Sequence, residues 1–174
     1  ETIDANAEKI KDFGRDIWCH AELGYREFRT AEKFNSAMKE LGMAVEEGLA
    51  ITGSKAYLKG KDAQGPTVAV IGELDALPIA NHPQSYNGAA HCCGHNAQMA
   101  ATFGAALAMS VPEVRDALGG NIAFMTAPSE EFVDIEYKSG LRREGKARYG
   151  GGKCELIRIG AFDDIDVALG HHAW

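Results

Sequence analysis

The sequence of 174 residues is long enough for one domain with a sizeable core, and 45% of its residues are hydrophobic, as in ordinary globular proteins. A formal net charge of -7 without a basic cluster argues against a nucleic-acid-binding surface, and no apolar stretch is long enough to span a membrane. The first residues lack the pattern of a secretory signal, and four cysteines in a core-rich chain do not require disulfides. We therefore expect a cytoplasmic protein with free thiols.

The first half of the chain is predicted to alternate between helices and strands. Residues 4–19 and 27–41 carry apolar side chains at helical spacing, and residues 44–60 have the composition of a β-hairpin. Residues 67–72 form a continuous apolar run, which is typical of a strand covered on both faces. Residues 96–110 are rich in Ala and Gly, so we expect a helix that lies close to the sheet.

The second half continues the same alternation. Residues 121–126 and 165–170 are further apolar runs and are predicted to be buried strands. Between them, residues 132–153 are polar, charged and Gly-rich, which indicates a surface excursion, and residues 155–159 suggest a short helix. The whole pattern predicts an α/β fold with a mixed, mainly parallel sheet and helices on both faces.

Polar side chains follow each of the three apolar strands. In such sheets ligands bind beyond the carboxyl ends of the strands. The pairs at these ends are Glu73 and Asp75, Glu130 and Glu131, and His171 and His172. Each pair alone has an ordinary structural explanation, such as a cap or a solvated turn. Their common position at the ends of three strands is what indicates a functional site.

A thiol and an imidazole stand close together in the segment from His91 to Asn96. Cys93 and His95 lie immediately before the small-residue helix, where the helix N-terminus favours a thiolate. Cysteine and histidine together suggest Zn²⁺, and adjacent glutamates allow one to bind metal while the other moves a proton. The sequence therefore predicts a metal site.

The motifs resemble those of the dinuclear metallopeptidases of the aminoacylase and glutamate-carboxypeptidase type, the peptidase M20 family. Within it they are most similar to the amidohydrolases of auxin conjugates, N-acyl amino acids and p-aminobenzoyl-glutamate. The matching segments are Trp18–Gly24 (His-x-x-Pro-Glu-Leu-Gly in the family), Gly72–Pro78 (Asp-x-Asp-Ala-Leu-Pro), His91–Asn96 (His-Ala-Cys-Gly-His-Asp), Ala127–Glu131 (Pro-Ala-Glu-Glu) and Asp166–His172 (Asp-x5-His).

The resemblance implies roles for individual residues. Two divalent ions, Zn²⁺ or Mn²⁺, would be held by Cys93 as the bridge together with the other ligands His95, Glu131 and His172. Glu130 and Asp75 would complete the site, as the general base and acid and as the carboxylate that orients a ligating histidine.

The resemblance also implies an activity and a domain organisation. The expected reaction is attack of metal-activated water on the amide bond of an N-acyl or N-aminoacyl amino acid, that is, a small amide or a dipeptide. Residues 1–174 would form the N-terminal portion of a zinc-peptidase-like catalytic domain. The lid or dimerisation domain and the C-terminal part of the catalytic domain, with a fifth metal ligand, would lie outside this chain. The full-length protein would be a homodimer.

The sequence departs from the family pattern at several positions. Asn96 replaces the usual Asp, Cys92 replaces Ala, and Gln98 stands where many members have His. The excursion 132–153 is longer than in the auxin-conjugate branch, which suggests a different substrate subgroup.

Three alternatives remain open from the sequence. The first is a metal-free thiol hydrolase that uses Cys93 and His95. The second is an inactive or incomplete fragment that acts only as a binding module. The third is a domain that binds Zn²⁺ for structural reasons.

Overall fold

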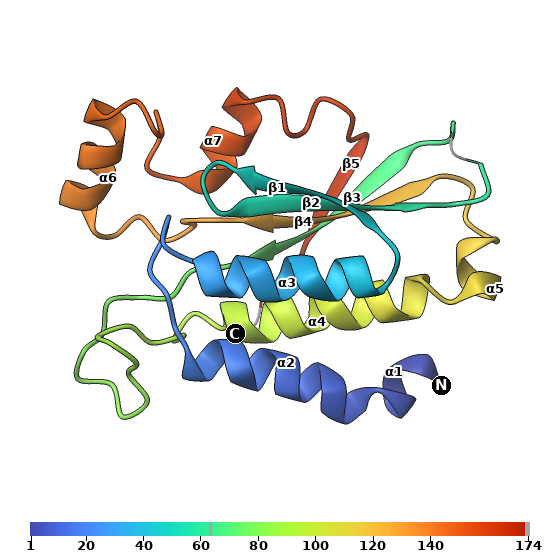
Figure 1. Cartoon of the computed structure of the whole chain (residues 1–174), viewed down its shortest axis with the longest axis horizontal. Coiled ribbons are helices and arrows are strands. Elements are labelled where there is room, and N and C mark those ends of the chain that lie inside the picture. Colours follow the sequence, from blue (N-terminus) through green and yellow to red (C-terminus); the bar gives the residue numbers. More distant parts are fainter. Residues whose placement is uncertain (63, 173–174) are drawn as a thin grey trace.

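The computed structural model describes residues 1–62 and 64–172, which form a five-stranded sheet with helices against it (Figure 1). In chain order the elements are α1 (Thr2–Ala5), α2 (Ala7–Cys19), α3 (Phe28–Glu40), β1 (Ala44–Leu49), β2 (Gly53–Lys59), β3 (Thr67–Glu73), α4 (His95–Met109), α5 (Pro112–Arg115), β4 (Asn121–Ala127), α6 (Ile135–Arg143), α7 (Gly152–Arg158) and β5 (Val167–Gly170). Among these described helices, none combines the length and the apolar character needed to cross a membrane.

The sheet is mixed, with the strand order β1-β2-β4-β3-β5. Strand β3 pairs in parallel with β4 on one side and with β5 on the other, whereas β2 runs antiparallel to both of its neighbours. The register sets Glu73 opposite Ala127, and Ile71 opposite Gly170. Because these three strands are parallel, the carboxyl ends of β3, β4 and β5 meet at one edge of the sheet. The prediction of a mixed sheet is confirmed.

Helices α3 and α4 cover one face of the sheet, and α2 packs against α4 on the side away from the sheet (Figure 1). The apolar side chains that recur at helical spacing in α3, such as Phe34 and Met38, are fully buried there. They pack in one cluster with Phe103 of α4 and Phe124 of β4. Burial of this cluster against the sheet is what stabilises helices that are too short to persist alone.

The opposite face carries α7, which confirms the prediction of helices on both faces. Leu156 of α7 is fully buried against Ala69, Ala123 and Met125 from the central strands. The excursion 132–153 also contains α6, a helix that the sequence analysis did not place. The short helix predicted at 155–159 begins earlier, at Gly152.

The prediction that residues 165–170 form a buried strand is wrong. Strand β5 is four residues long and lies at the edge of the sheet, with Val167 49% and Leu169 54% exposed. An apolar run is expected both of an inner strand and of an edge strand with an apolar face, so composition alone did not distinguish them.

The small residues of α4 face α2 and allow these two helices to lie close together. A Cβ atom on Gly14 of α2 would lie 2.8 Å from Ala100 Cβ, and one on Gly104 would lie 3.2 Å from Ile10. Toward the sheet, α4 presents larger side chains, and there the close approach is provided by Gly72 of β3, whose Cβ would lie 2.6 Å from Met99 Sδ. The glycine that allows α4 to approach the sheet therefore lies in the strand.

Candidate metal centre

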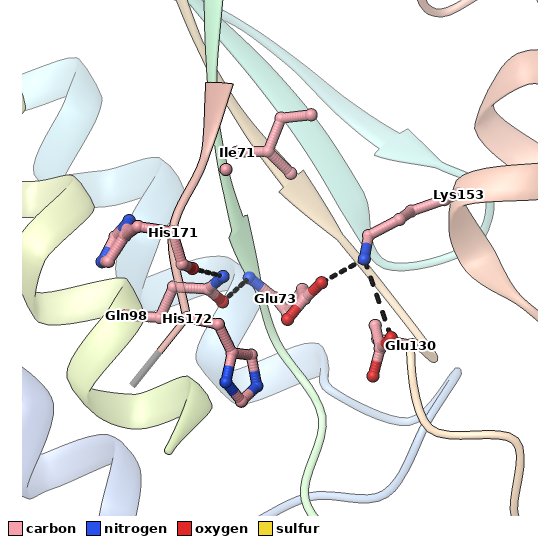
Figure 2. Close-up of a pocket in the computed structure, with 8 residues that line it drawn as sticks. Ile71, Glu73, Gln98, Glu130, Lys153, His171 and His172 are labelled. Atoms are coloured by element: carbon pink, nitrogen blue, oxygen red, sulfur yellow. Dashed lines mark hydrogen bonds and ion pairs between the residues drawn. The ribbon is translucent and has the colours of Figure 1, made fainter. Parts of the chain in front are cut away.

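The strand ends predicted to carry functional residues line a single pocket of about 330 Å³ (Figure 2). It opens at the carboxyl ends of β3 and β5 and beside the first turn of α7. Its lining residues are Ile71, Glu73, Gln98, Glu130, Lys153, Gly170, His171 and His172. The arrangement follows from the parallel pairing, which brings segments distant in sequence to the same edge of the sheet.

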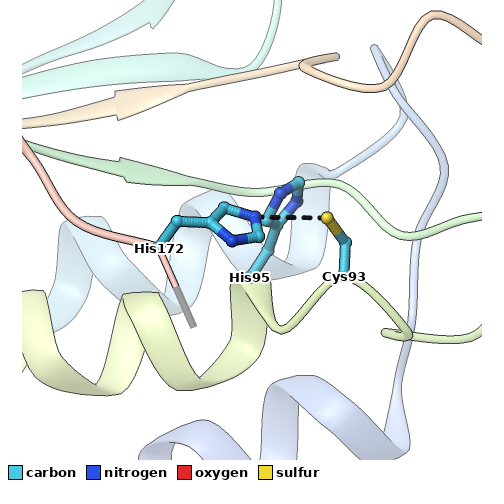
Figure 3. A group of neighbouring side chains, drawn as sticks. All are labelled: Cys93, His95 and His172. Atoms are coloured by element: carbon cyan, nitrogen blue, oxygen red, sulfur yellow. Dashed lines mark hydrogen bonds between the residues drawn. The ribbon is translucent and has the colours of Figure 1, made fainter. Parts of the chain in front are cut away.

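Cys93, His95 and His172 come together at this edge (Figure 3). Gly94 adopts a left-handed backbone conformation (φ +87°) and precedes α4, so that Cys93 and His95 lie on either side of a sharp turn. The Cys93 Sγ and His172 Nε2 atoms are 3.2 Å apart, and one potential ligand atom from each of the three side chains lies within 4.8 Å of the others. Of the predicted ligands, these three are grouped by the fold.

The ring of His95 is fully buried and has a fixed orientation. Its Nδ1 atom donates a hydrogen bond to the backbone carbonyl oxygen of Asp75 at 2.8 Å. Its Nε2 atom lies 3.0 Å from Glu73 Oε2 and 3.9 Å from Glu130 Oε2. Burial lowers the pKa of His95, but the Asp75 and Glu73 carboxylates outweigh that effect and raise its pKa to about 10. The surroundings of His95 Nε2 therefore carry a strong negative charge.

Asp75 orients more than one part of the site. Its backbone carbonyl accepts the bond from His95, while its carboxylate Oδ1 lies 3.6 Å from His95 Nδ1. The same carboxylate accepts hydrogen bonds from the backbone N–H groups of Glu130 and Glu131, at 2.9 Å and 3.0 Å. Asp75 thus links the candidate ligand His95 to the turn that carries both glutamates.

The two glutamates face different surroundings. The Glu130 side chain is 34% exposed and reaches into the pocket. Glu131 lies against Cys93, where burial and then the Glu131 carboxylate raise the pKa of the thiol to about 12. Glu131 is not in the group formed by Cys93, His95 and His172, although it is adjacent to Cys93.

The donor set fits a divalent cation. A sulfur, imidazole nitrogens and carboxylate oxygens converge, and this mixture is typical of zinc sites. Glu73 Oε2 and His95 Nε2 are buried and face each other at 3.0 Å as an ion pair, whereas Glu131 Oε1 is buried without a hydrogen bond to any described residue. A buried carboxylate oxygen without a partner is costly, and a bound cation would remove that cost. His95 also belongs to a second possible ligand group with Glu73 and Glu130.

His171 and His172 have different positions. His171 contributes its carbonyl oxygen to a hydrogen bond from Gln98 Nε2, whereas the ring of His172 meets that of His95 edge to face at 5.6 Å. Figures 2 and 3 show the His172 ring directed into the site. Of the two adjacent histidines, His172 is the one grouped with Cys93 and His95.

Comparison with known proteins reveals relatives along nearly the whole chain, although no protein-family model matches. The chain is 30% identical to a subunit of the p-aminobenzoyl-glutamate hydrolase of Escherichia coli, over 99% of this chain and 34% of that protein. It is 28% identical to an N-acyl-L-amino acid amidohydrolase of Geobacillus stearothermophilus, over 92% of this chain and 40% of that protein. Among solved structures, the YXEP protein of Bacillus subtilis, a dinuclear metal-binding peptidase from the M20 family, matches with a TM-score of 0.78 and 25% identity, over 98% of this chain and 44% of that one.

The chain is related to the M20 peptidases and amidohydrolases. The resemblance and the fold expected from the sequence motifs are thereby confirmed. The chain spans only 34% and 40% of the length of the two curated relatives named above.

Two pocket residues of this M20-related chain were not predicted. Lys153 of α7 forms an ion pair with Glu73, and its Nζ lies 3.7 Å from Glu130 Oε1. Gln98 accepts a hydrogen bond from the Glu73 backbone N–H at 2.7 Å and donates to the His171 carbonyl, so it connects the ends of β3 and β5. Burial raises the pKa of Glu73, but His95 and Lys153 outweigh it and lower that pKa to about 2.

Glu27 is a third residue for which the sequence indicated no role in the site. Its carboxylate is fully buried and accepts hydrogen bonds from Thr52 Oγ1 at 2.6 Å and from the Ser129 backbone N–H at 2.7 Å. Ser129 has a left-handed backbone (φ +49°), which is strained for a residue with a side chain. Glu27 therefore supports the turn immediately before Glu130.

Proposed function

We propose that this chain is part of a metal-dependent amidohydrolase or peptidase that cleaves the amide bond of an N-acyl or N-aminoacyl amino acid. The observation that carries the proposal is the group of Cys93, His95 and His172 at the edge of the pocket into which Glu130 reaches. The names of the relatives support it, because they include hydrolases of acylated amino acids. The substrate would be a small amide or a dipeptide.

Each residue of the site has a role in this proposal. Cys93, His95, Glu131 and His172 would hold two divalent ions, with Cys93 as the bridge. Bound ions would supply Lewis-acid activation of water and of the amide carbonyl. Thiolate and imidazole ligands favour Zn²⁺, whereas the carboxylate of Glu131 also suits Mn²⁺.

Glu130 would be the proton carrier. Its backbone is fixed by Asp75 while its side chain is partly exposed in the pocket, so the carboxylate can take a proton from water and deliver it to the leaving amine. Asp75 would hold the turn of Glu130 and Glu131 in register with His95.

We also propose that residues 1–174 are the N-terminal portion of a larger catalytic domain. The relatives are more than twice as long as this chain, and the apolar side chains Val167 and Leu169 of the edge strand are half exposed. A lid or dimerisation domain and the rest of the catalytic domain would complete the enzyme as a homodimer. A cytoplasmic location is supported by the cysteines, which are all free among the described residues.

Metal analysis and an amidase assay on the full-length protein test the function. We expect stoichiometric metal and hydrolysis of N-acyl amino acids, dipeptides or aminobenzoyl-glutamate, both lost with a chelator. Glu130→Gln should keep the metal and lower kcat by at least about 100-fold, because the proton carrier is removed. Near-normal turnover in that variant would remove Glu130 from the mechanism.

The metal-free thiol hydrolase is the second candidate. The 3.2 Å contact between Cys93 Sγ and His172 Nε2 supports it, with His172 in place of the predicted His95 as the base beside the thiol. It leaves the buried oxygen of Glu131 without a role. Full activity in protein stripped of metal would favour this candidate over the metalloenzyme.

A further inference from the structure

Lys153 is a charged residue of the pocket to which the proposed reaction gives no role. It lies in the first turn of α7, and its side chain crosses the pocket toward two carboxylates (Figure 2). The ammonium group forms an ion pair with Glu73 and lies 3.7 Å from Glu130 Oε1. A single cation thus connects a carboxylate at the end of β3 with one just beyond the end of β4.

The two carboxylates depend on this cation to different degrees. Glu73 is 5% exposed, so its charge is removed from water and requires a partner. Glu130 is held by its backbone through Asp75, but the ion-pair contacts of its side chain are with Lys153 at 3.7 Å and His95 at 3.9 Å. If His95 Nε2 binds a metal ion, Lys153 becomes the positively charged side chain that remains to pair with the Glu130 carboxylate.

We propose that Lys153 is a positioning residue of this site, which holds the Glu130 carboxylate beside Glu73 and provides a fixed positive charge next to the metal ligands. The inference rests on the proposed role of Glu130. Removal of the ammonium group should change turnover and metal affinity in opposite directions. Without the ammonium group, Glu130 loses its orientation and turnover falls. At the same time, a positive charge that repels divalent ions is removed, so metal binds more tightly.

Two other roles for Lys153 are less consistent with the geometry. A lysine that binds a substrate carboxylate should have an available charge, whereas this one already faces two carboxylates. A purely structural role is not needed, because α7 is anchored by the buried Leu156 and by Glu155, whose carboxylate accepts bonds from the backbone N–H groups of Arg148 and Tyr149. The Lys153 side chain itself is 45% exposed, so the helix should form without it.

The test compares Lys153→Met and Lys153→Arg in the full-length protein, with Lys146→Met as the matched control. Lys146 is an exposed lysine that pairs with Glu144. Isothermal titration with Zn²⁺ should show Lys153→Met binding roughly 3- to 10-fold more tightly, from the loss of one nearby charge. Its kcat should fall about 10-fold or more with KM within twofold, because proton transfer depends on a positioned carboxylate. Lys153→Arg should resemble the wild type in both measurements, as should Lys146→Met.

The two readouts separate this inference from the proposed function. If Zn²⁺ affinity is unchanged or weaker in Lys153→Met, the inference is wrong whatever the activity. A raised KM with unchanged kcat would also overturn it, because Lys153 would then bind substrate. If the wild-type protein binds Zn²⁺ but hydrolyses no amide, the proposed function fails, while the Zn²⁺ titration still decides the electrostatic role of Lys153.

Discussion

His95 donates its Nδ1 hydrogen bond to the backbone carbonyl of Asp75 at 2.8 Å, and the Asp75 carboxylate lies farther away, at 3.6 Å. This leaves the carboxylate available for the backbone N–H groups of Glu130 and Glu131. The orientation of the candidate ligand His95 is therefore fixed by the main chain, and the buried charge of Asp75 is used to fix the glutamate turn. One residue sets the relative position of both halves of the site.

Asp75→Asn should weaken metal binding, although the backbone carbonyl that orients His95 is kept. An amide has one oxygen where the carboxylate has two, so either Glu130 or Glu131 keeps a backbone N–H without a good partner in a partly buried position. We expect a loss of about 1–3 kcal/mol in unfolding free energy. Metal affinity should fall about 10- to 100-fold, as is typical when a residue that orients metal ligands is changed. Urea unfolding and metal titration measure the two effects.

Asp12→Asn provides the control for that experiment. Asp12 pairs with Arg15 on the exposed surface of α2, and its loss should change stability by less than about 0.5 kcal/mol. If Asp75→Asn behaves like Asp12→Asn in both measurements, Asp75 does not organise the turn.

Cys93→Ala should lower metal affinity at least about 10-fold, whereas Cys92→Ala should change it less than twofold, because only one of these adjacent thiols lies in the ligand group. Cys92 is exposed and Cys93 is partly buried beside His172. Because Cys92 and Cys93 are adjacent, the two variants provide a matched comparison. Elemental analysis after dialysis against limiting Zn²⁺ gives the occupancy of each variant, and equal losses would contradict Cys93 as the bridging ligand.

Much of this fold could be predicted because its strands are continuous apolar runs and its helices carry regular apolar spacing. The strand ends then indicated which polar residues meet, and the fold brings His172, just beyond the end of β5, together with Cys93 and His95 at the start of α4. The edge position of β5 could not be predicted, since Val167 and Leu169 look the same in a buried strand.

The supporting residues of the site could not be predicted for a different reason. Lys153 lies in a charged, Gly-rich excursion, and Glu27 precedes an ordinary amphipathic helix. Nothing in their local sequence separates a buried carboxylate or a pocket lysine from a solvated one. Their roles depend on contacts with residues about 80 to 100 positions away, such as Glu73 and Ser129, which only the tertiary structure defines.

Gly14→Ala should destabilise the protein even though alanine favours helices. The new Cβ would lie 2.8 Å from Ala100 Cβ and 3.0 Å from the Asn96 carbonyl oxygen, so α2 and α4 must move apart. We expect a loss of about 1–3 kcal/mol in unfolding free energy, typical of overpacking. Gly140→Ala in α6 is the control, because the nearest atom to the new Cβ would be in the Arg143 side chain, 3.9 Å away. That change should stabilise α6 by up to about 1 kcal/mol. Urea unfolding of both variants checks the prediction, and two changes of the same sign would contradict it.

The buried carboxylate of Glu27 should make stability depend on pH. Burial, and then the charge of Asp75, raise its pKa from 4.5 to about 7. Between these values the unfolded chain loses the proton while the folded protein keeps it, so the folded state becomes less favourable as pH rises. Above pH 7 both states are ionised and this contribution is constant.

Glu27→Gln should therefore gain stability relative to the wild type as pH rises from 4.5 to about 7, by on the order of 3 kcal/mol, and no further above that range. The amide can still accept from the Ser129 N–H and can donate to Thr52 Oγ1, so the turn should persist. Urea unfolding at several pH values, with a chelator present, gives the difference between the two proteins. Thr52→Val removes a hydrogen bond that stabilises the ionised carboxylate, so it should extend the pH-dependent loss of stability to higher pH. A difference between Glu27→Gln and the wild type that does not change across this range would show that folding does not raise the pKa of Glu27.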